Sequence, residues 1–266
     1  MRDRRTFHPM AWIVWATSAG FVAFVTTDPV YLFLLWAVSW FVYASHRVDA
    51  EHARSFRLFL TGATIAVALR TGLVFFGTVS AANTTFSFLE GLRLGTILVI
   101  FGTFNAVTDP FGVVRMAPRR FHEPALAAAL ALSIAPRTIA SAQRVREAQT
   151  LRGLRTTGLR SLPALAIPIL ETGMEDAVTM AESMDARGHG HGTRSRYRPQ
   201  PWNRRSILCT GAALTAAGAF SAAAFTGVGG LHPSTFPLLW PEVSAGLLAA
   251  AGLLAVPGLS RSRGAP

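Results

Sequence analysis

The chain has 266 residues, of which 51% are hydrophobic and only 15% are charged. A soluble globular protein needs more polar surface than this, so the composition excludes that class and indicates membrane-spanning segments. The formal net charge of +11 comes from arginine, since the sequence contains no lysine, and loops beside an anionic membrane explain it better than nucleic-acid binding does.

Six apolar stretches follow one another along the chain, and most are close to the roughly 20 residues that a helix needs to cross a bilayer. They cover residues 10–25, 30–44, 58–78, 86–106, 207–228 and 238–256. An apolar segment in lipid has no hydrogen-bond partner for its backbone except itself, so each stretch is expected to be a helix. The sequence therefore predicts an all-α, polytopic membrane protein with about six transmembrane helices.

The placement of arginine predicts the orientation of these spans. Arginines occur before the first span, between the second and third, throughout the long middle segment and in the C-terminal tail, whereas the connections 26–29, 79–85 and 229–237 have none. Arginine-bearing loops remain in the cytoplasm. We therefore expect both termini to be cytoplasmic, with four spans in residues 1–108, a cytoplasmic segment in 109–205 and two spans in 206–266.

The middle segment is too long for a simple connection and contains two helical stretches. The first is predicted from about Pro136 to Arg152, with an apolar extension upstream over 125–134 as a membrane-surface or partly inserted helix. The second is predicted from about Pro168, a possible kink, to Arg187. Opposite charges and small residues on the two helices predict a close crossing. The second helix also has an apolar stripe at helical spacing, beside a row of carboxylates, formed by Leu170, Met174, Ala177, Ala181 and Met184.

The two helices end alike, in Glu-Ala-Gln-Thr-Leu-Arg-Gly (147–153) and Glu-Ser-Met-Asp-Ala-Arg-Gly (182–188). Ordinary capping explains one such ending, because glycine ends helices and arginine complements the helix dipole. Two similar endings on consecutive cytoplasmic helices are harder to explain in this way. An arginine at a helix end is well placed to form a forked, charge-assisted contact with a carboxylate of another protein.

These endings resemble those of the two coupling helices in a known family, the transmembrane (T) component of energy-coupling factor transporters. The resemblance covers about residues 92–188 and departs from the family at Leu151, where alanine is frequent, and at His189, where an aromatic residue is usual. The stretches that carry it are Leu92-Arg93-Leu94, Thr108-Asp109-Pro110, Ala117-Pro118, Ala148-Gln149 with Arg152-Gly153, and Ala181 to Gly188.

The resemblance implies a non-catalytic subunit with two long cytoplasmic coupling helices between spans four and five. It would transmit ATP hydrolysis by two partner ATPases, which bind ATP and Mg, to a membrane-embedded substrate-binding (S) component that takes up a vitamin or a metal ion. This chain would hold no cofactor and would lie in a bacterial inner membrane. The residues implied to dock on the ATPases are Leu151, Arg152, Gly153, Ala186, Arg187 and Gly188, and the apolar stripe would contact the S component.

Three ionisable residues, Arg70, Glu90 and Arg93, lie inside predicted spans, where charges are costly. We predict that a buried Arg70–Glu90 or Glu90–Arg93 pair locks the third and fourth spans together.

Two other functions stay open. A membrane-embedded enzyme would need paired catalytic groups at membrane depth, and only Glu90 is a candidate carboxylate. A self-sufficient secondary transporter would have an internal repeat and broken helices, which the sequence does not show. We predict no catalytic residues and no metal site, because His189 and His191 lie on a glycine-rich turn without a third ligand nearby.

Overall fold

The computed structural model describes residues 7–46, 50–77, 79–153, 162–189, 202–227, 230–232 and 243–259. Within these ranges the chain is helical and has no strand, which confirms the predicted all-α fold class. The chain forms two compact units. Unit 1 consists of Met1–Asp109 and Gln200–Pro266, and unit 2 of Pro110–Pro199.

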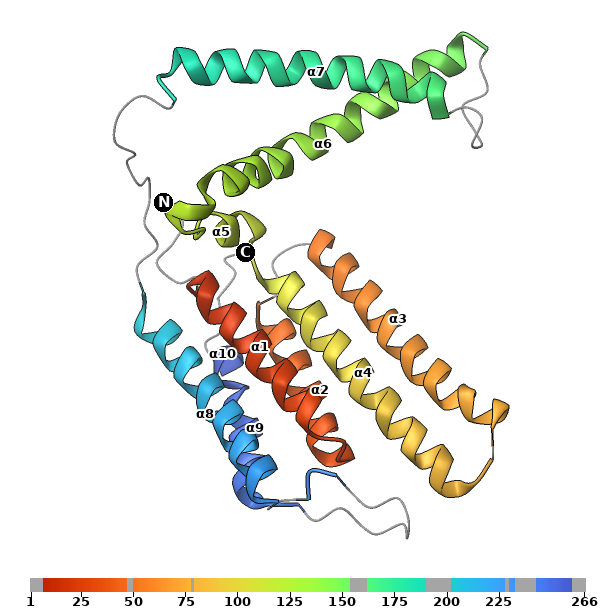
Figure 1. Cartoon of the computed structure of the whole chain (residues 1–266), viewed down its shortest axis with the longest axis vertical. Helices are drawn as coiled ribbons and strands as arrows, with labels where there is room; N and C mark the ends of the chain where they lie inside the picture. The colour runs from red at the N-terminus through yellow and green to blue at the C-terminus, as the bar shows by residue number, and fades with distance from the viewer. Residues whose placement is uncertain are drawn as a thin grey trace. The chain divides into compact units, whose positions relative to one another are not determined.

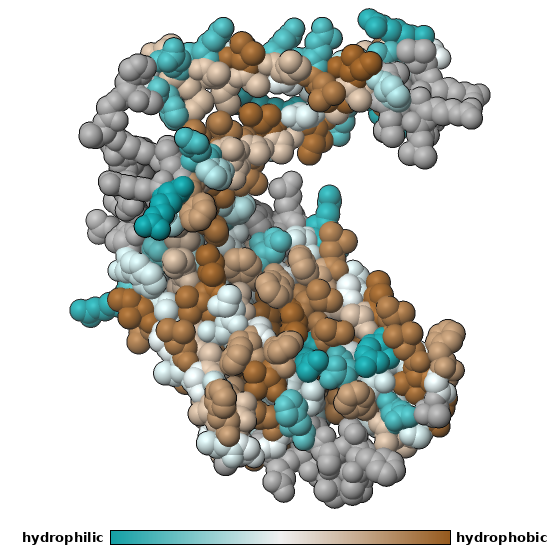
Figure 2. Space-filling model, in the orientation of Figure 1, coloured by the Kyte–Doolittle hydropathy of each residue, from teal (hydrophilic) through white to brown (hydrophobic). Residues whose placement is uncertain are grey.

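Unit 1 is a helical bundle (Figure 1). Its elements are α1 (Pro9–Val25), α2 (Pro29–His46), α3 (Ala50–Gly72), the 3₁₀ turn η1 (Leu73–Phe76), α4 (Ala81–Val107), α8 (Arg204–Thr226), α9 (Ala245–Leu253) and α10 (Val256–Leu259). Apolar side chains cover much of the visible face of this unit (Figure 2). Such an exterior suits a bilayer and would be a liability in water.

Five helices in the described ranges are long and apolar enough to cross a membrane, namely α2, α3 with η1, α4, α6 and α8. The predicted spans 30–44, 58–78, 86–106 and 207–228 coincide with four of them, which confirms a multi-pass membrane protein. The predicted span 10–25 corresponds to α1, whose 17 residues make it a shorter apolar helix. The predicted span 238–256 lies partly outside the described residues, and its described part contains α9.

The core of unit 1 forms where α1 and α2 meet α8 and α9. Trp15 of α1 is fully buried there, and its indole Nε1 donates a hydrogen bond of 2.8 Å to the carbonyl oxygen of Leu254. Helix α1 is also tied to the α8 region at both ends, because the His8 N–H donates to Ser206 Oγ (2.9 Å) and the Thr27 N–H donates to the Leu231 carbonyl (2.9 Å). Unit 1 is thereby held as one scaffold.

Helix α3 packs closely on α4 because α4 presents glycines to it. A Cβ atom at Gly91 would lie 3.0 Å from Val67 Cα, one at Gly95 would lie 3.1 Å from Val67 Cγ2, and one at Gly102 would lie only 2.6 Å from Phe59 Cβ. Small residues that let two backbones approach are the usual means of helix association in lipid. The α3–α4 hairpin therefore depends on the missing side chains of α4.

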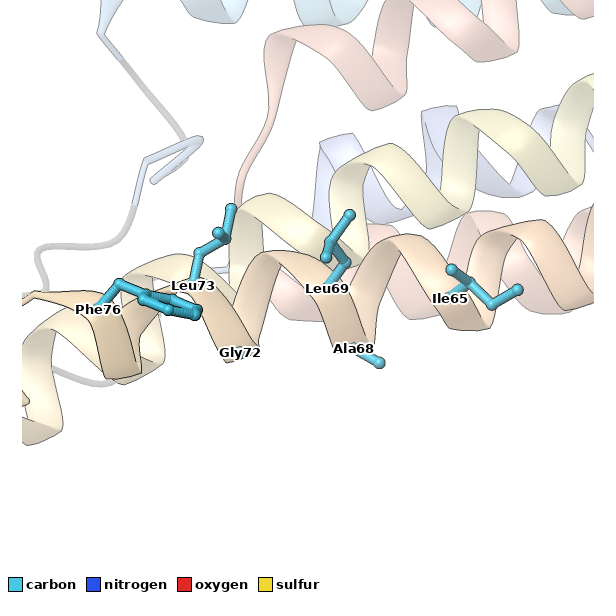
Figure 3. Close-up of a pocket in the computed structure, with 6 residues that line it drawn as sticks. All are labelled: Ile65, Ala68, Leu69, Gly72, Leu73 and Phe76. Atoms are coloured by element: carbon cyan, nitrogen blue, oxygen red, sulfur yellow. The ribbon is translucent and has the colours of Figure 1, made fainter.

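Another side of α3 is apolar and uncovered in unit 1. A shallow groove runs along it (Figure 3), lined by Ile65, Ala68, Leu69, Gly72, Leu73 and Phe76. Ile65 and Leu69 are each 64% exposed. In hydrocarbon such a surface can contact lipid or another helix without an energetic penalty.

Unit 2 consists of a short helix, α5 (Pro110–Val114), a 3₁₀ turn, η2 (Arg119–Phe121), and two long helices, α6 (His122–Leu151) and α7 (Leu162–Ala186). The predicted starts near Pro136 and Pro168 are wrong, since both prolines lie inside their helices, whereas the predicted upstream extension over 125–134 is part of α6. Upstream of Pro136 the chain is a run of alanine and leucine, the strongest helix formers, and this propensity outweighs the proline signal.

The apolar part of α6 gives unit 2 a candidate span that the sequence analysis assigned to the cytoplasmic segment. The helix from Glu123 to Leu151 meets the length and hydropathy of a span, and its most apolar 18-residue stretch has no buried residue. Its first half is apolar except for His122, Glu123 and Ser133, whereas the second half carries Arg137, Arg144, Arg146 and Glu147. The first half thus has the composition of a membrane-contacting helix and the second half that of a water-exposed one.

Candidate functional site

Helix α6 ends at Gly153, whose left-handed backbone conformation favours glycine over other residues. The Arg152 N–H donates to the Ala148 carbonyl (3.2 Å), and the Gly153 N–H donates to the Thr150 carbonyl (3.0 Å). Gly153 has a φ of 76°. A side chain at this φ is strained, so glycine lets the helix end directly after Arg152.

The end of α7 has the same design. Gly188 has a φ of 75°, and the His189 N–H donates back to the Met184 carbonyl (3.0 Å) while the Gly188 N–H donates to the Asp185 carbonyl (2.8 Å). This six-to-one bond together with a left-handed glycine is a Schellman motif. Arg187 therefore occupies the last position before a sharp stop, as Arg152 does on α6.

The side chains at both ends are exposed. Leu151, an apolar residue, is 90% exposed, and Arg152, Ala186 and Arg187 are exposed as well. In the described part of the chain, neither Arg152 nor Arg187 has an ion-pair partner. A large apolar side chain beside a free guanidinium is typical of a surface that another protein covers.

The two ends are far apart within unit 2. The chain runs along α6, turns and comes back along α7, so that the two helices finish at opposite ends of the unit (Figure 1). The 25 residues of α7 alone span about 38 Å at 1.5 Å per residue. One small partner groove cannot hold both ends, so each end needs a binding site of its own.

The predicted apolar stripe of α7 is exposed to solvent in unit 2. Leu170 is 65% and Met174 is 70% exposed, Ala177 and Ala181 are also exposed, and Met184 is half-buried. The structure adds two residues that the sequence analysis missed, Ile167 (66% exposed) and Val178 (57%). Their spacing of seven and four residues around Met174 follows the same helical period, so that pattern was sufficient to find them.

Where α6 and α7 contact each other, no ion pair joins them in the described ranges. Ser141 of α6 is buried in this unit. The carboxylates Glu171, Glu175, Glu182 and Asp185 of α7 are exposed, and none forms an ion pair in the described ranges. The expected attraction between α6 arginines and α7 carboxylates is therefore absent from the described contacts, and both charged surfaces point outward.

Within unit 1, Glu90 and Arg93 form an ion pair with an Nη2–Oε2 distance of 2.9 Å. Both residues belong to α4, so this pair does not itself join α3 to α4 as we had predicted. The guanidinium of Arg93 instead lies over the ring of Phe24 in α1, 5.6 Å from its centroid. Arg70 of α3 has no ion pair among the described residues, because one turn separates Glu90 and Arg93 and they satisfy each other.

No group of three or more possible metal ligands lies together among the described residues. His189 is exposed at the end of α7, and His191 lies outside the described residues.

No family model matches the chain, but a comparison with individual known proteins does agree with these features. The chain is similar to the energy-coupling factor transporter transmembrane protein EcfT of Bacillus selenitireducens, with 28% identity over 169 residues, which is 57% of this chain and 63% of that relative. The matched region thus spans less than two thirds of the relative's length. At this modest identity, the similarity confirms the resemblance that the paired helix endings indicated, to the transmembrane component of energy-coupling factor transporters.

Proposed function

We propose that the chain is the non-catalytic coupling subunit of an ATP-driven importer, in which two ATP-binding subunits drive a membrane-embedded substrate-binding subunit. The observation that supports this most is the pair of matching helix ends. Arg152–Gly153 and Arg187–Gly188 each end a helix at a glycine with a left-handed φ, are exposed, and lie at opposite ends of unit 2. Two equivalent ends suit two equivalent receptors, as an ATPase dimer provides.

The chemistry of docking follows from the arginines. Each guanidinium presents a planar fork of donors that matches a carboxylate, and the contact strengthens when water is excluded from it. The exposed Leu151 would supply that exclusion at the end of α6. We infer that each end enters a groove with acidic residues on one ATP-binding subunit, which binds ATP and Mg itself.

Movement of the two helix ends would be transmitted through the chain connections between unit 2 and unit 1. The segment that leaves α4 enters α5, and α8 begins after unit 2 with Ser206 bonded to the start of α1. ATP-driven movement of the two ends would shift α6 and α7 against this scaffold. The exposed apolar stripe of α7 would then carry the movement to the substrate-binding subunit, whose cargo would be a vitamin or a metal ion.

Orientation is part of the same proposal. Unit 2 must face the compartment that holds ATP, so it and both termini would be cytoplasmic, in a bacterial inner membrane. The arginine distribution supports this placement.

Copurification tests the function. The tagged chain, extracted from membranes in a mild detergent, should retain two copies of an ATP-binding subunit and one small membrane protein, and ATP hydrolysis should depend on the ATP-binding subunits alone. A chain that catalyses uptake after purification without any ATP-binding subunit would instead be a secondary transporter. Turnover of a substrate by the isolated chain would indicate a membrane-embedded enzyme.

A further inference from the structure

Arg70, Glu90 and Arg93 lie within the spans formed by α3 and α4, and their charges do not cancel. Glu90 and Arg93 of α4 neutralise each other at 2.9 Å, and Arg93 is held further by the ring of Phe24. Arg70 of α3 has neither an ion pair nor a hydrogen bond among the described residues, and its side chain is partly exposed. The three residues together carry a net charge of +1 inside two apolar helices.

The depth of Arg70 follows from its neighbour on α4. A Cβ atom at Gly91 would lie 3.2 Å from Arg70 Cβ, so the two residues are level. Helix α4 has 27 residues, a length of about 40 Å at 1.5 Å per residue. Gly91 is ten residues from its start at Ala81, which places the level of Arg70 about 5 Å from the midpoint of α4.

This depth decides what can neutralise Arg70. The hydrocarbon is about 30 Å thick, so with α4 centred in it the nearest lipid phosphate lies at least about 10 Å from the level of Arg70. That is beyond an extended arginine side chain. Glu90, the nearest carboxylate along α4, already accepts from Arg93 Nη2. An ionisable group at this depth pairs with an opposite charge or a backbone carbonyl, and no described residue forms an ion pair or a hydrogen bond with Arg70.

We propose that Arg70 binds a carboxylate on a transmembrane helix of another subunit. The surface beside it suits such a helix, because Leu73, three residues further along the chain at the start of η1, is 49% exposed and lines the groove in Figure 3. The partner is therefore an apolar helix with one aspartate or glutamate near its middle. The inference rests on the proposed function in one respect, since it takes the membrane-embedded substrate-binding subunit as that partner.

The first test compares partner retention by variants of Arg70 in the complete complex. The chain is expressed with its partner subunits, assembled into phosphatidylcholine nanodiscs, and washed. Arg70→Glu should retain at least about tenfold less of the membrane-embedded subunit, which corresponds to about 1.4 kcal/mol, and Arg70→Lys should retain most of it. Arg57→Gln, at an exposed position of the same helix, is the matched control and should behave like the wild type. Equal retention by all three variants overturns the proposal.

The second test exchanges the two charges between the subunits. Restored binding would also show that the Arg70→Glu chain is inserted in the membrane. Each aspartate or glutamate within the spans of the membrane-embedded subunit is changed to arginine and combined with Arg70→Glu. One combination should restore retention, and the amide variant of that same carboxylate should weaken binding to the wild-type chain. If no combination restores binding and no amide variant weakens it, Arg70 has no carboxylate partner.

Two further outcomes distinguish a failure of the proposed Arg70 contact from a failure of the proposed function. If the wild-type complex assembles only with anionic phosphatidylglycerol, and Arg70→Gln removes that requirement, a lipid phosphate is the occupant and the proposal is wrong. Loss of the ATP-binding subunits from the wild type would contradict the proposed function instead. Arg70 variants should keep those subunits at the wild-type level, so the two failures are distinguishable.

Discussion

Replacing both Arg152 and Arg187 by glutamate is expected to abolish substrate uptake while leaving the protein in the membrane at its normal level. Both side chains are exposed and lack ion-pair partners in the described ranges, so exchanging them should change folding by no more than about 0.5 kcal/mol. At a desolvated interface, however, removal of one partner of an arginine–carboxylate pair costs about 2–5 kcal/mol. Each single variant should therefore lose at least about tenfold in uptake, and the double variant more.

Uptake of radiolabelled substrate by cells, normalised to the amount of protein in the membrane, measures this effect. Arg137→Glu is the matched control, because it makes the same charge change at an exposed position in the middle of α6 and should leave uptake nearly unchanged. Normal transport by the double variant would refute the role of the helix ends. A similar loss in the control would show that charge on unit 2 matters without regard to position.

Gly102→Ala is expected to destabilise unit 1 even though alanine is the better helix former. The added methyl group would lie 2.6 Å from Phe59 Cβ, an atom that cannot move without the backbone of α3. Overpacking of this kind costs about 1–3 kcal/mol, and it should push α3 away from α4. A lower midpoint of thermal unfolding in detergent, followed by size-exclusion fluorescence, is the expected result.

The matched control for this prediction is Gly62→Ala in the middle of α3. A Cβ atom at Gly62 meets nothing within 4 Å, so only the gain in helix propensity remains, about 0.5–1 kcal/mol in favour of alanine. The two substitutions should thus have effects of opposite sign. A Gly102→Ala protein as stable as the Gly62→Ala protein would contradict the close packing of α3 on α4.

The sequence was sufficient for the features that depend on local chemistry. Hydropathy placed four of the spans, and the Arg-Gly pairs located both helix ends, since glycine after the last turn is a local backbone requirement. The starts of α6 and α7 are misplaced because Pro136 suits the first turn of a helix and Pro168 suits a kink, yet both lie inside their helices. The helix-forming run before Pro136 was the competing signal in that case.

Features that depend on which faces of two helices meet are harder to predict from the sequence. From their depths in the membrane, Glu90 could pair with either Arg70 or Arg93. Only the structure shows that Glu90 pairs with Arg93 and that Arg70 has no ion pair among the described residues. The glycines of α4 were visible in the sequence, but nothing there indicated that Val67 and Phe59 of α3 fill the space above them. Likewise, the opposite charges of α6 and α7 predicted attraction, whereas the helices expose them.

Site-specific cross-linking tests the central claim, that the two helix ends dock on ATP-binding subunits. The chain has one cysteine, Cys209, which is buried and can be replaced by alanine. A photoactivatable reagent is then attached to Leu151→Cys, Ala186→Cys or Met174→Cys in membranes that contain all subunits. If the helix ends dock as proposed, positions 151 and 186 both cross-link to an ATP-binding subunit, and position 174 cross-links to the membrane-embedded subunit. Failure of either helix end to reach an ATP-binding subunit, with position 174 reaching one instead, would contradict it.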